Sequence, residues 1–381
     1  MNKTYDVVLV DHGYFAMEGF SSGLMIILRE VMNELRRFGL SCAIATYEED
    51  LHPTIYAAGF DILQRNGSAL KYKDWLSNTL TAADARITIT HLPAIEITDQ
   101  CIIAAQVCNQ IATKRLTVLA DPLFPKRAEV GDALFEHYYN EIAATEVVGI
   151  GTDARALFEA ETGILATKLM NPYEVERFYA PDRQADAARY VTMVNFHPLK
   201  GSALFVEIAR RMPEVDFLLI KNWPDAPTPQ DLPPNLEMRP FFEDPKVLYR
   251  ETRLLLVPSL WREGPARVVL EALFNGIQPI IHRIGSLPEF EDCGVIYIDP
   301  PEGTRFEQKG SVLVPVVPNR EQERIVTAFI ETINATLAEK DPTRAAHLHA
   351  MAAAYVRQSR EVLFEACLRW MDETKALETT P

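Results

Sequence analysis

Short runs of apolar, often β-branched residues alternate with amphipathic stretches along most of the chain. The apolar runs are continuous, which is typical of parallel strands that are covered on both faces. The stretches between them have the spacing of apolar positions expected of helices. Right-handed crossovers between such strands build a doubly wound domain. The pattern therefore predicts an α/β protein.

The expected elements form two series on either side of a polar stretch at 179–190. The first series has strands at 5–10, 41–47, 61–64, 85–90, 116–120 and 147–152, and helices at 23–38, 73–83, 95–112, 131–144 and 153–161. The second has strands at 190–196, 215–221, 235–240, 253–259, 278–283 and 294–299, and helices at 202–212, 245–251 and 265–275. We expect a loop or short hairpin at 300–318 and helices at 319–338 and 343–375.

This order predicts two Rossmann-like, doubly wound domains followed by a long C-terminal helix. The expected ranges are 1–183, 184–350 and 351–381, with the last helix crossing back to the first domain. A chain of 381 residues also exceeds the size at which one core stops growing. Ligands of such sheets bind outside the carboxyl ends of the strands, so we expect a cleft between the two domains.

Composition narrows the classes of function. The net charge is −15, which disfavours nucleic acid or a strongly anionic lipid surface as a partner. No apolar run approaches the roughly 20 residues of a membrane span, so at most peripheral membrane contact is expected. The sequence starts directly in a strand-like run, so we expect no signal peptide. The five scattered cysteines favour reduced thiols, and we expect a cytoplasmic protein.

Residues 261–276, WREGPARVVLEALFNG, contain the densest candidate chemistry. Gly264 is expected to be the N-cap of a helix, Pro265 its first residue, and Gly276 the glycine that ends it. The start of a helix directs backbone N–H groups and a positive dipole end at phosphate, and Arg267 adds a cation there. Glu263 and Glu271 can accept hydrogen bonds from sugar hydroxyls, although such a spacing of glutamates is also common on surface helices.

The spacing resembles the E-x7-E signature of glycosyltransferase family 4, whose members are retaining enzymes with the two-Rossmann GT-B fold. Three other stretches are similar to the same family: EALFNGIQPIIHRIGSLPEF (271–290), VNFHPLKGSALFVEIARRMPEVDFLLI (194–220) and MNPYEVERFYAP (170–181). The resemblance covers most of 165–300 and is looser over 1–160. It implies that the first domain binds the acceptor and the second binds the nucleotide sugar.

The resemblance assigns roles residue by residue. It implies that Lys200 contacts the donor diphosphate, Glu271 binds the ribose, and Glu263 holds the donor sugar. The backbone of Gly264, Pro265 and Ala266 would line the phosphates.

The chain departs from the family pattern upstream of Lys200, where Val194 and Asn195 stand at the positions of the usual arginine. Asn195 then belongs to the donor-binding loop without supplying a charge. Arg267 is the candidate substitute cation, and a surface ion pair is the alternative for it.

Five residues of the first domain are further candidates. His91 follows an expected strand where the family places a histidine near the reacting centre. His12 follows the first strand, and Tyr14 and Phe15 follow it in turn; these three are candidates for contact with the acceptor. Gly23 would let the backbone approach the donor.

The sequence thus predicts a hexosyltransferase that uses a nucleotide diphosphate sugar and a hydroxyl acceptor on a glycan or small molecule. We expect the donor to be a UDP-sugar. The resemblance implies retention of configuration. We expect no metal, because no Asp-x-Asp follows a strand. Two alternatives stay open. One is an inverting transferase or a nucleotide-sugar 2-epimerase that uses His12 or His91 as acid or base. The other is a non-catalytic subunit that binds a sugar nucleotide.

Overall fold

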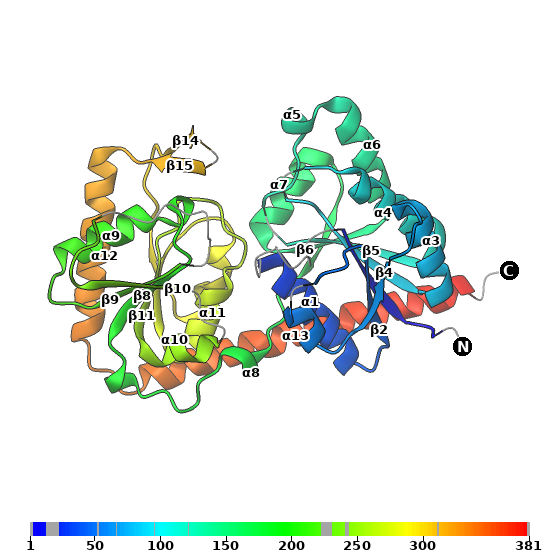
Figure 1. The fold of residues 1–381 in the computed structure, drawn as a ribbon. Helices are drawn as coiled ribbons and strands as arrows, with labels where there is room; N and C mark the ends of the chain where they lie inside the picture. The colour runs from blue at the N-terminus through cyan, green and yellow to red at the C-terminus, as the bar shows by residue number, and fades with distance from the viewer. Residues whose placement is uncertain are drawn as a thin grey trace. The chain divides into compact units, whose positions relative to one another are not determined.

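The computed structural model describes residues 3–12, 23–51, 53–65, 67–94, 96–120, 122–221, 231–240, 244–310 and 312–378. The chain divides into two compact units (Figure 1). Unit 1 comprises Met1–Tyr173 and Arg357–Pro381, and unit 2 comprises Glu174–Val356. The first division of the chain therefore lies upstream of the expected boundary at 183/184, and the second lies inside the last helix.

Unit 1 is a parallel sheet covered by helices. Its strands are β1 (Val7–Asp11), β2 (Cys42–Thr46), β3 (Asp61–Gln64), β4 (Ile87–His91), β5 (Lys114–Leu119), β6 (Glu146–Ile150) and β7 (Ala166–Leu169). Its helices are α1 (Gly23–Arg37), α2 (Pro53–Ala57), α3 (Tyr72–Ala83), α4 (Asp99–Ile111), α5 (Arg127–Val130), α6 (Asp132–Ala143) and α7 (Thr152–Thr162). The strand order is β3-β2-β1-β4-β5-β6-β7.

The continuous apolar run of β1 is explained by burial on both faces of this sheet. Val7 and Leu9 pack with α1 and with the C-terminal helix α13 (Arg344–Glu378). Val8 and Val10 point to the opposite face and pack with α3 and α4. Successive side chains of a strand point to opposite faces, so both parities must be apolar here.

Unit 2 repeats the plan. Its strands are β8 (Tyr190–Val194), β9 (Phe217–Lys221), β10 (Leu236–Pro240), β11 (Thr252–Val257), β12 (Gln278–His282) and β13 (Ile296–Ile298), in the order β10-β9-β8-β11-β12-β13. Its helices are α8 (Val175–Phe178), α9 (Ser202–Arg211), α10 (Pro245–Glu251), α11 (Arg267–Phe274) and α12 (Asn319–Ala338), with 3-10 turns η1 (Ala185–Ala187), η2 (Pro198–Lys200) and η3 (Leu287–Cys293). Helices α9 and α12 cover one face of this sheet, and α11 packs on β11 and β12 (Figure 1).

The two doubly wound sheets confirm the predicted fold class, and β14 (Arg305–Lys309) with β15 (Val312–Val316) confirms the expected hairpin. Two of the differences from the sequence prediction concern β7 and α4. Strand β7 was not predicted, because its ATKL run is short and half polar. Helix α4 begins at Asp99 rather than at 95, since Thr98 caps it. Within the described residues, no helix is both long enough and apolar enough to cross a bilayer.

Candidate functional site

Unit 2 has its topological switch point between β8 and β11. These strands are neighbours in the sheet, but the chain leaves β8 towards β9 on one side and β11 towards β12 on the other. The two loops that leave their carboxyl ends, 195–201 and 258–266, therefore begin side by side. Such a position is where doubly wound sheets bind ligands. Both loops contain residues that the sequence singles out.

Backbone contacts fix the first of these loops against the second. The carbonyl of Leu199 accepts hydrogen bonds from the backbone N–H groups of Leu260 at 2.9 Å and Trp261 at 3.2 Å. Gly201 has φ +81°, and a Cβ built on it would lie 2.0 Å from the carbonyl oxygen of Pro258. Only glycine allows that approach. Lys200 is consequently presented from a rigid turn.

Lys200 and Glu263 meet at this switch point. The Lys200 Nζ lies 2.5 Å from Oε2 of Glu263. The hydroxyl of Ser259 donates to the other carboxylate oxygen, Oε1, at 2.5 Å. The lysine side chain is 30% exposed and the glutamate only 8%. A half-exposed ammonium is thus oriented by a buried carboxylate, an arrangement suited to binding an anion that arrives from solvent.

The backbone of Glu263 is held as well. Its carbonyl accepts from the N–H of Ser286 at 2.8 Å. Gly285 has φ +59°, and a Cβ there would lie 2.4 Å from the nitrogen of Glu263. The start of the stretch GSLPE (285–289) thereby packs directly on the first glutamate of the E-x7-E pattern.

Below the loop, Nδ1 of His282 lies 2.9 Å from the carbonyl oxygen of Ser259. A carbonyl only accepts, so Nδ1 carries the hydrogen. Burial lowers the pKa of His282 to about 4, so the ring is neutral near pH 7. His282 and Ser259 are both fully buried and brace the carboxylate from beneath.

Helix α11 starts later than its sequence suggests. It begins at Arg267 with Ala266 as N-cap, so the prediction that Gly264 caps it and Pro265 opens it is wrong. Residues 258–266 instead form the loop that connects β11 to α11 and that contains Glu263. Alanine has no side-chain acceptor, so the first-turn N–H groups of α11 have no side-chain cap from that position. Gly276, with φ +67°, ends the helix as expected.

Glu271 lies on α11 and already has two partners. The Tyr249 hydroxyl donates to its Oε2 at 2.5 Å, and Nη2 of Arg267 lies 3.5 Å from its Oε1. Burial, followed by the charge of Glu271, raises the pKa of Tyr249 well above its usual value, so the phenol stays a donor. Arg267 is only 12% exposed and forms this ion pair along the helix. The ion-pair alternative for Arg267 is therefore present in the structure.

Unit 1 carries its candidates at the equivalent place, the switch point between β1 and β4. The rings of His12 and His91 stack with centroids 3.8 Å apart. His91 has no exposed side-chain surface, and its Nε2 lies 3.8 Å from Oδ1 of Asp11. Burial, together with the nearby His12, lowers the pKa of His91 to about 4. The half-buried His12 is therefore the more accessible of the two histidines.

His12 also contacts Cys101. Its Nδ1 lies 3.5 Å from Sγ of the cysteine, and its Nε2 lies 2.9 Å from the carbonyl oxygen of His91. Asp11 beneath them accepts a hydrogen bond from the Thr46 hydroxyl at 3.1 Å. The structure thus joins His12 and His91 in one cluster with Asp11 and Cys101.

The remaining predicted residues are less informative. Asn195 has φ +76° at the end of β8, a conformation that asparagine tolerates better than most residues. A Cβ on Gly23 would meet nothing within 4 Å, so no described neighbour requires glycine there. Tyr14 and Phe15 lie outside the described residues.

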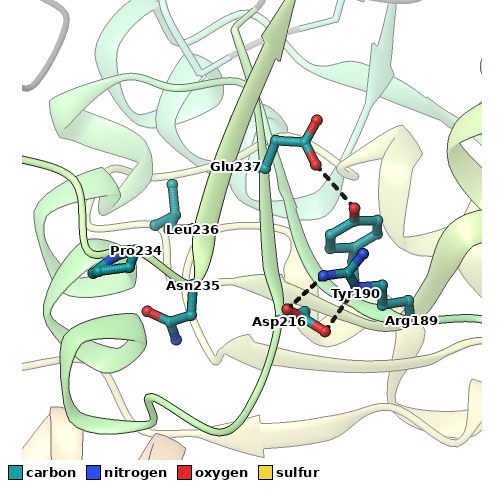
Figure 2. Close-up of a pocket in the computed structure, with 7 residues that line it drawn as sticks. All are labelled: Arg189, Tyr190, Asp216, Pro234, Asn235, Leu236 and Glu237. Carbon is teal, nitrogen blue, oxygen red and sulfur yellow. Dashed lines mark hydrogen bonds and ion pairs between the residues drawn. The ribbon is translucent and has the colours of Figure 1, made fainter.

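A polar pocket of about 330 Å³ lies elsewhere, at the amino ends of β8, β9 and β10 (Figure 2). Its charged groups are satisfied by one another: Arg189 contacts Asp216 through two nitrogens at 2.7 and 2.9 Å, and the Tyr190 hydroxyl donates to Glu237 at 2.9 Å. It is at the opposite edge of the sheet from Lys200 and Glu263. We therefore place the candidate site at the switch point rather than in this pocket.

The sequence prediction singles out Lys200, Glu263, Glu271 and Arg267 as candidates. It did not include their neighbours in the structure, Ser259, His282 and Tyr249. Ser259 is the last residue and His282 the next-to-last residue of predicted strands of unit 2, and that position was the available signal. Tyr249 comes from a different helix, α10, and its sequence context carries no signal of its contact with Glu271.

No protein-family model matches the sequence, and no curated protein does. Solved structures do resemble it. A glycosyltransferase from Rickettsia africae ESF-5 aligns with TM-score 0.70 at 12% identity over 99% of this chain and 100% of that one. HepE from Anabaena in complex with UDP aligns with TM-score 0.68 at 14% identity over 95% and 99%. Sucrose-phosphate synthase from Thermosynechococcus elongatus aligns with TM-score 0.63 at 14% identity over 97% and 98%. At these identities the likeness establishes the fold, which is GT-B.

Proposed function

We propose that the protein is a glycosyltransferase that moves a hexosyl unit from a nucleotide diphosphate sugar, with a UDP-sugar as donor, to a hydroxyl acceptor. The observation that carries this proposal is the Lys200–Glu263 pair at the switch point of unit 2, with Glu271 further along the same E-x7-E stretch. HepE, one of the structures with this fold, was solved with UDP and with UDP-glucose, which supports the choice of donor.

In this proposal Lys200 binds the diphosphate and the first turn of α11 supports it. Negative charge develops on the diphosphate as the glycosidic bond breaks, and pre-positioned donors stabilise it in the transition state. When phosphate engages Lys200, Oε2 of Glu263 becomes available to accept a hydrogen bond from a sugar hydroxyl. Ser259 keeps the carboxylate oriented during that exchange. In this proposal the cations and the backbone amides stabilise the charge of the leaving diphosphate, and no metal ion is required.

Glu271 would bind the ribose, with Tyr249 holding its carboxylate in place. Arg267 is the second cation for the diphosphate, replacing the arginine that the family usually has before Lys200. Because its ion pair with Glu271 is long at 3.5 Å, a short rotation of the guanidinium can satisfy both partners.

Retention is the proposed stereochemical course. An inverting reaction needs a general base beside the acceptor, and a histidine can act as one only while it is neutral. His91 is neutral but has no exposed side-chain surface, and His12 is engaged with Cys101 and the carbonyl of His91. The acceptor proton would pass instead to the leaving phosphate. The acceptor would lie by unit 1, whose described residues at the switch point are histidines, a cysteine and one buried aspartate.

The five cysteines all have free thiols, which supports the cytoplasm as the proposed location, because that compartment keeps thiols reduced.

The test is a transfer and donor-hydrolysis assay with a panel of UDP-, GDP- and ADP-sugars. Lys200→Ala should lower kcat by about 100-fold or more, since it removes a charge-assisted contact to the leaving group. Glu271→Gln should mainly raise KM for the donor. Lys168→Ala and Glu365→Gln remove exposed side chains elsewhere and should leave the rates unchanged. Wild-type rates in both site variants would disprove the assignment. Proton NMR of the anomeric signal separates retention from inversion.

A further inference from the structure

Cys101 differs from the other cysteines in its surroundings. It is the third residue of α4, and its Sγ lies 3.5 Å from Nδ1 of His12 and 3.1 Å from the hydroxyl of Thr98. The remaining four are buried and have no imidazole partner in the described contacts: Cys42, Cys108, Cys293 and Cys367. Sulfur, imidazole and hydroxyl thus converge at the carboxyl edge of the unit 1 sheet.

The hydrogen positions on His12 follow from its contacts. Its Nε2 faces the carbonyl oxygen of His91 at 2.9 Å, and because that oxygen only accepts, Nε2 carries a hydrogen. Nδ1 then has two possible states. It either accepts a hydrogen from a neutral thiol or carries a second hydrogen and donates it to a thiolate.

Two features favour the charged state. Cys101 lies in the first turn of α4, where the positive end of the helix dipole stabilises a thiolate. Asp11 lies below the paired histidines and stabilises an imidazolium through its negative charge. A neutral His12–Cys101 pair would lose both of these interactions.

The pKa directions agree with this geometry. Burial alone would raise the pKa of Cys101, but the hydrogen bonds from His12 and Thr98 outweigh burial and lower it. Burial alone would lower the pKa of His12, but Cys101 and Asp11 outweigh burial and raise it. Burial raises the pKa of Cys42 and Cys108 to about 12, and of Cys293 and Cys367 to about 11.

We propose that Cys101 and His12 form a thiolate–imidazolium pair, and that Cys101 is a modification site for small electrophiles and for hydrogen peroxide. With peroxide, the thiolate sulfur attacks one oxygen, an S–O bond forms and the O–O bond breaks. The cysteine is oxidised to the sulfenic acid and the peroxide is reduced. The leaving hydroxide takes the proton from the His12 imidazolium and departs as water.

The pH dependence of this site involves every titratable group that faces the pair. In the described residues these are Asp11 at the end of β1, His91 at the end of β4 and Tyr72 on α3. Burial, followed by the charges of nearby Cys108, Asp11 and Cys101, raises the pKa of Tyr72. Tyr72 stays protonated, and His91 stays neutral near pH 7, so the pair titrates against the constant charge of its surroundings. Alkylation should therefore follow a single midpoint.

The experiment measures the thiolate in two ways on the full-length protein. Ultraviolet thiolate absorbance is followed from pH 5 to 10 in the wild type and in Cys101→Ser, and the difference should titrate below the ordinary thiol pKa of about 8.5. Because only 3% of Cys101 is exposed, a small reagent is needed, and iodoacetamide is applied at pH 7. Mass spectrometry of the peptides then measures how fast each cysteine is alkylated. We expect Cys101 to be alkylated at least about tenfold faster than Cys108, a cysteine of the same helix that is 1% exposed, since each pKa unit changes the thiolate fraction about tenfold.

His12→Asn should move the absorbance midpoint upward and slow alkylation of Cys101, whereas His137→Asn, at an exposed histidine of α6, should change neither. Circular dichroism checks that each variant is folded. Absence of a thiolate signal at pH 7 in the wild type would overturn the ion pair. A thiolate that alkylates no faster than Cys108 would overturn the modification site. Neither measurement depends on transferase activity, so this inference stands apart from the proposed function.

Discussion

The carboxylate of Glu263 has both oxygens engaged within unit 2, one by the Ser259 hydroxyl and one by the Lys200 ammonium. When a buried carboxylate loses one hydrogen-bond partner, the folded state loses about 1–3 kcal/mol of stability, or the carboxylate moves to find another partner. A small change at Ser259 therefore affects the proposed phosphate site through Glu263, although Ser259 itself is fully buried.

Ser259→Ala should lower kcat/KM for the donor by about tenfold, because Glu263 then loses its fixed orientation towards Lys200. Ser259→Thr, which keeps the hydroxyl, should recover most of this loss. Steady-state kinetics with a UDP-sugar and calorimetric binding of UDP give the two readouts. Equal kinetics in the alanine variant and the wild type would show that this hydrogen bond does not orient the site.

The buried His282 leads to a second prediction, on how the free energy of unfolding depends on pH. Its folded pKa of about 4 lies below the unfolded value of about 6.5, so the unfolded chain binds more protons between these values. Its contribution to stability is complete above about pH 6.5 and is lost as the pH falls towards 4, by on the order of 3 kcal/mol. His91, with the same shift, acts in the same sense.

Denaturant unfolding at several pH values should accordingly show the free energy of unfolding falling below pH 6.5. His282→Gln, which cannot titrate, should have a lower stability at pH 7.5 but a shallower decline between pH 6.5 and 4. A variant with the same slope as the wild type would contradict the assignment of a neutral, buried His282.

At the scale of elements, the site depends on how closely η2 approaches the loop after β11. Gly201 permits that approach, because its missing side chain leaves room for the carbonyl of Pro258. Gly39 has a similar φ, +92°, but a Cβ there would meet nothing within 4 Å. Comparing substitutions at Gly201 and Gly39 therefore separates the loss of stability that comes from positive φ from the loss that comes from a steric clash.

Gly39→Ala should cost about 1 kcal/mol through its positive φ alone. Gly201→Ala should cost more, by about 1–3 kcal/mol beyond Gly39→Ala, and should also weaken UDP binding, because η2 must move away and carry Lys200 with it. Urea unfolding and calorimetry measure the two effects. Equal losses of stability in both variants would mean that the contact with Pro258 is easily relieved.

The sequence predicted most elements of unit 2 to within a residue or two because their periodicity is strong. It misplaced the start of α11, since Gly264 and Pro265 satisfy capping rules that the tertiary contacts of Glu263 override. It proposed Lys200 and Glu263 as candidates from the family resemblance, but it could not predict their direct ion pair, because the two residues belong to loops distant in sequence. Their contact, like that between Cys101 and His12, depends on strand order, which periodicity does not determine.

At the scale of the whole molecule, α13 contributes to both units. Its first part, up to Val356, belongs to unit 2, where His349 bonds the carbonyl of Phe274. Its second part belongs to unit 1, where Trp370 is 1% exposed in the core that contains β1 and α1. The Trp370 indole N–H also donates to Glu146 at 3.2 Å.

Trp370→Ala should destabilise unit 1 by about 3–5 kcal/mol, because it opens a large cavity in that core. Hydrogen exchange should rise in β1 and α1 and stay unchanged in β8 and β11, which share no core with this residue. Leu368→Ala, at a side chain that is 50% exposed, should alter exchange in neither unit. Uniform loss of protection across both sheets would show instead that the units unfold as one.

The path of α13 also determines the order in which the two units can complete their folding during synthesis on the ribosome. Unit 2 is an insertion, in chain terms, between Tyr173 and Arg357 of unit 1. During synthesis every residue of unit 2 is made before the segment that completes the core of unit 1 leaves the exit tunnel. Unit 1 is therefore the later of the two units to complete its core, and the β1 face that packs with Trp370 lacks this partner in the nascent protein until that part of α13 has been made.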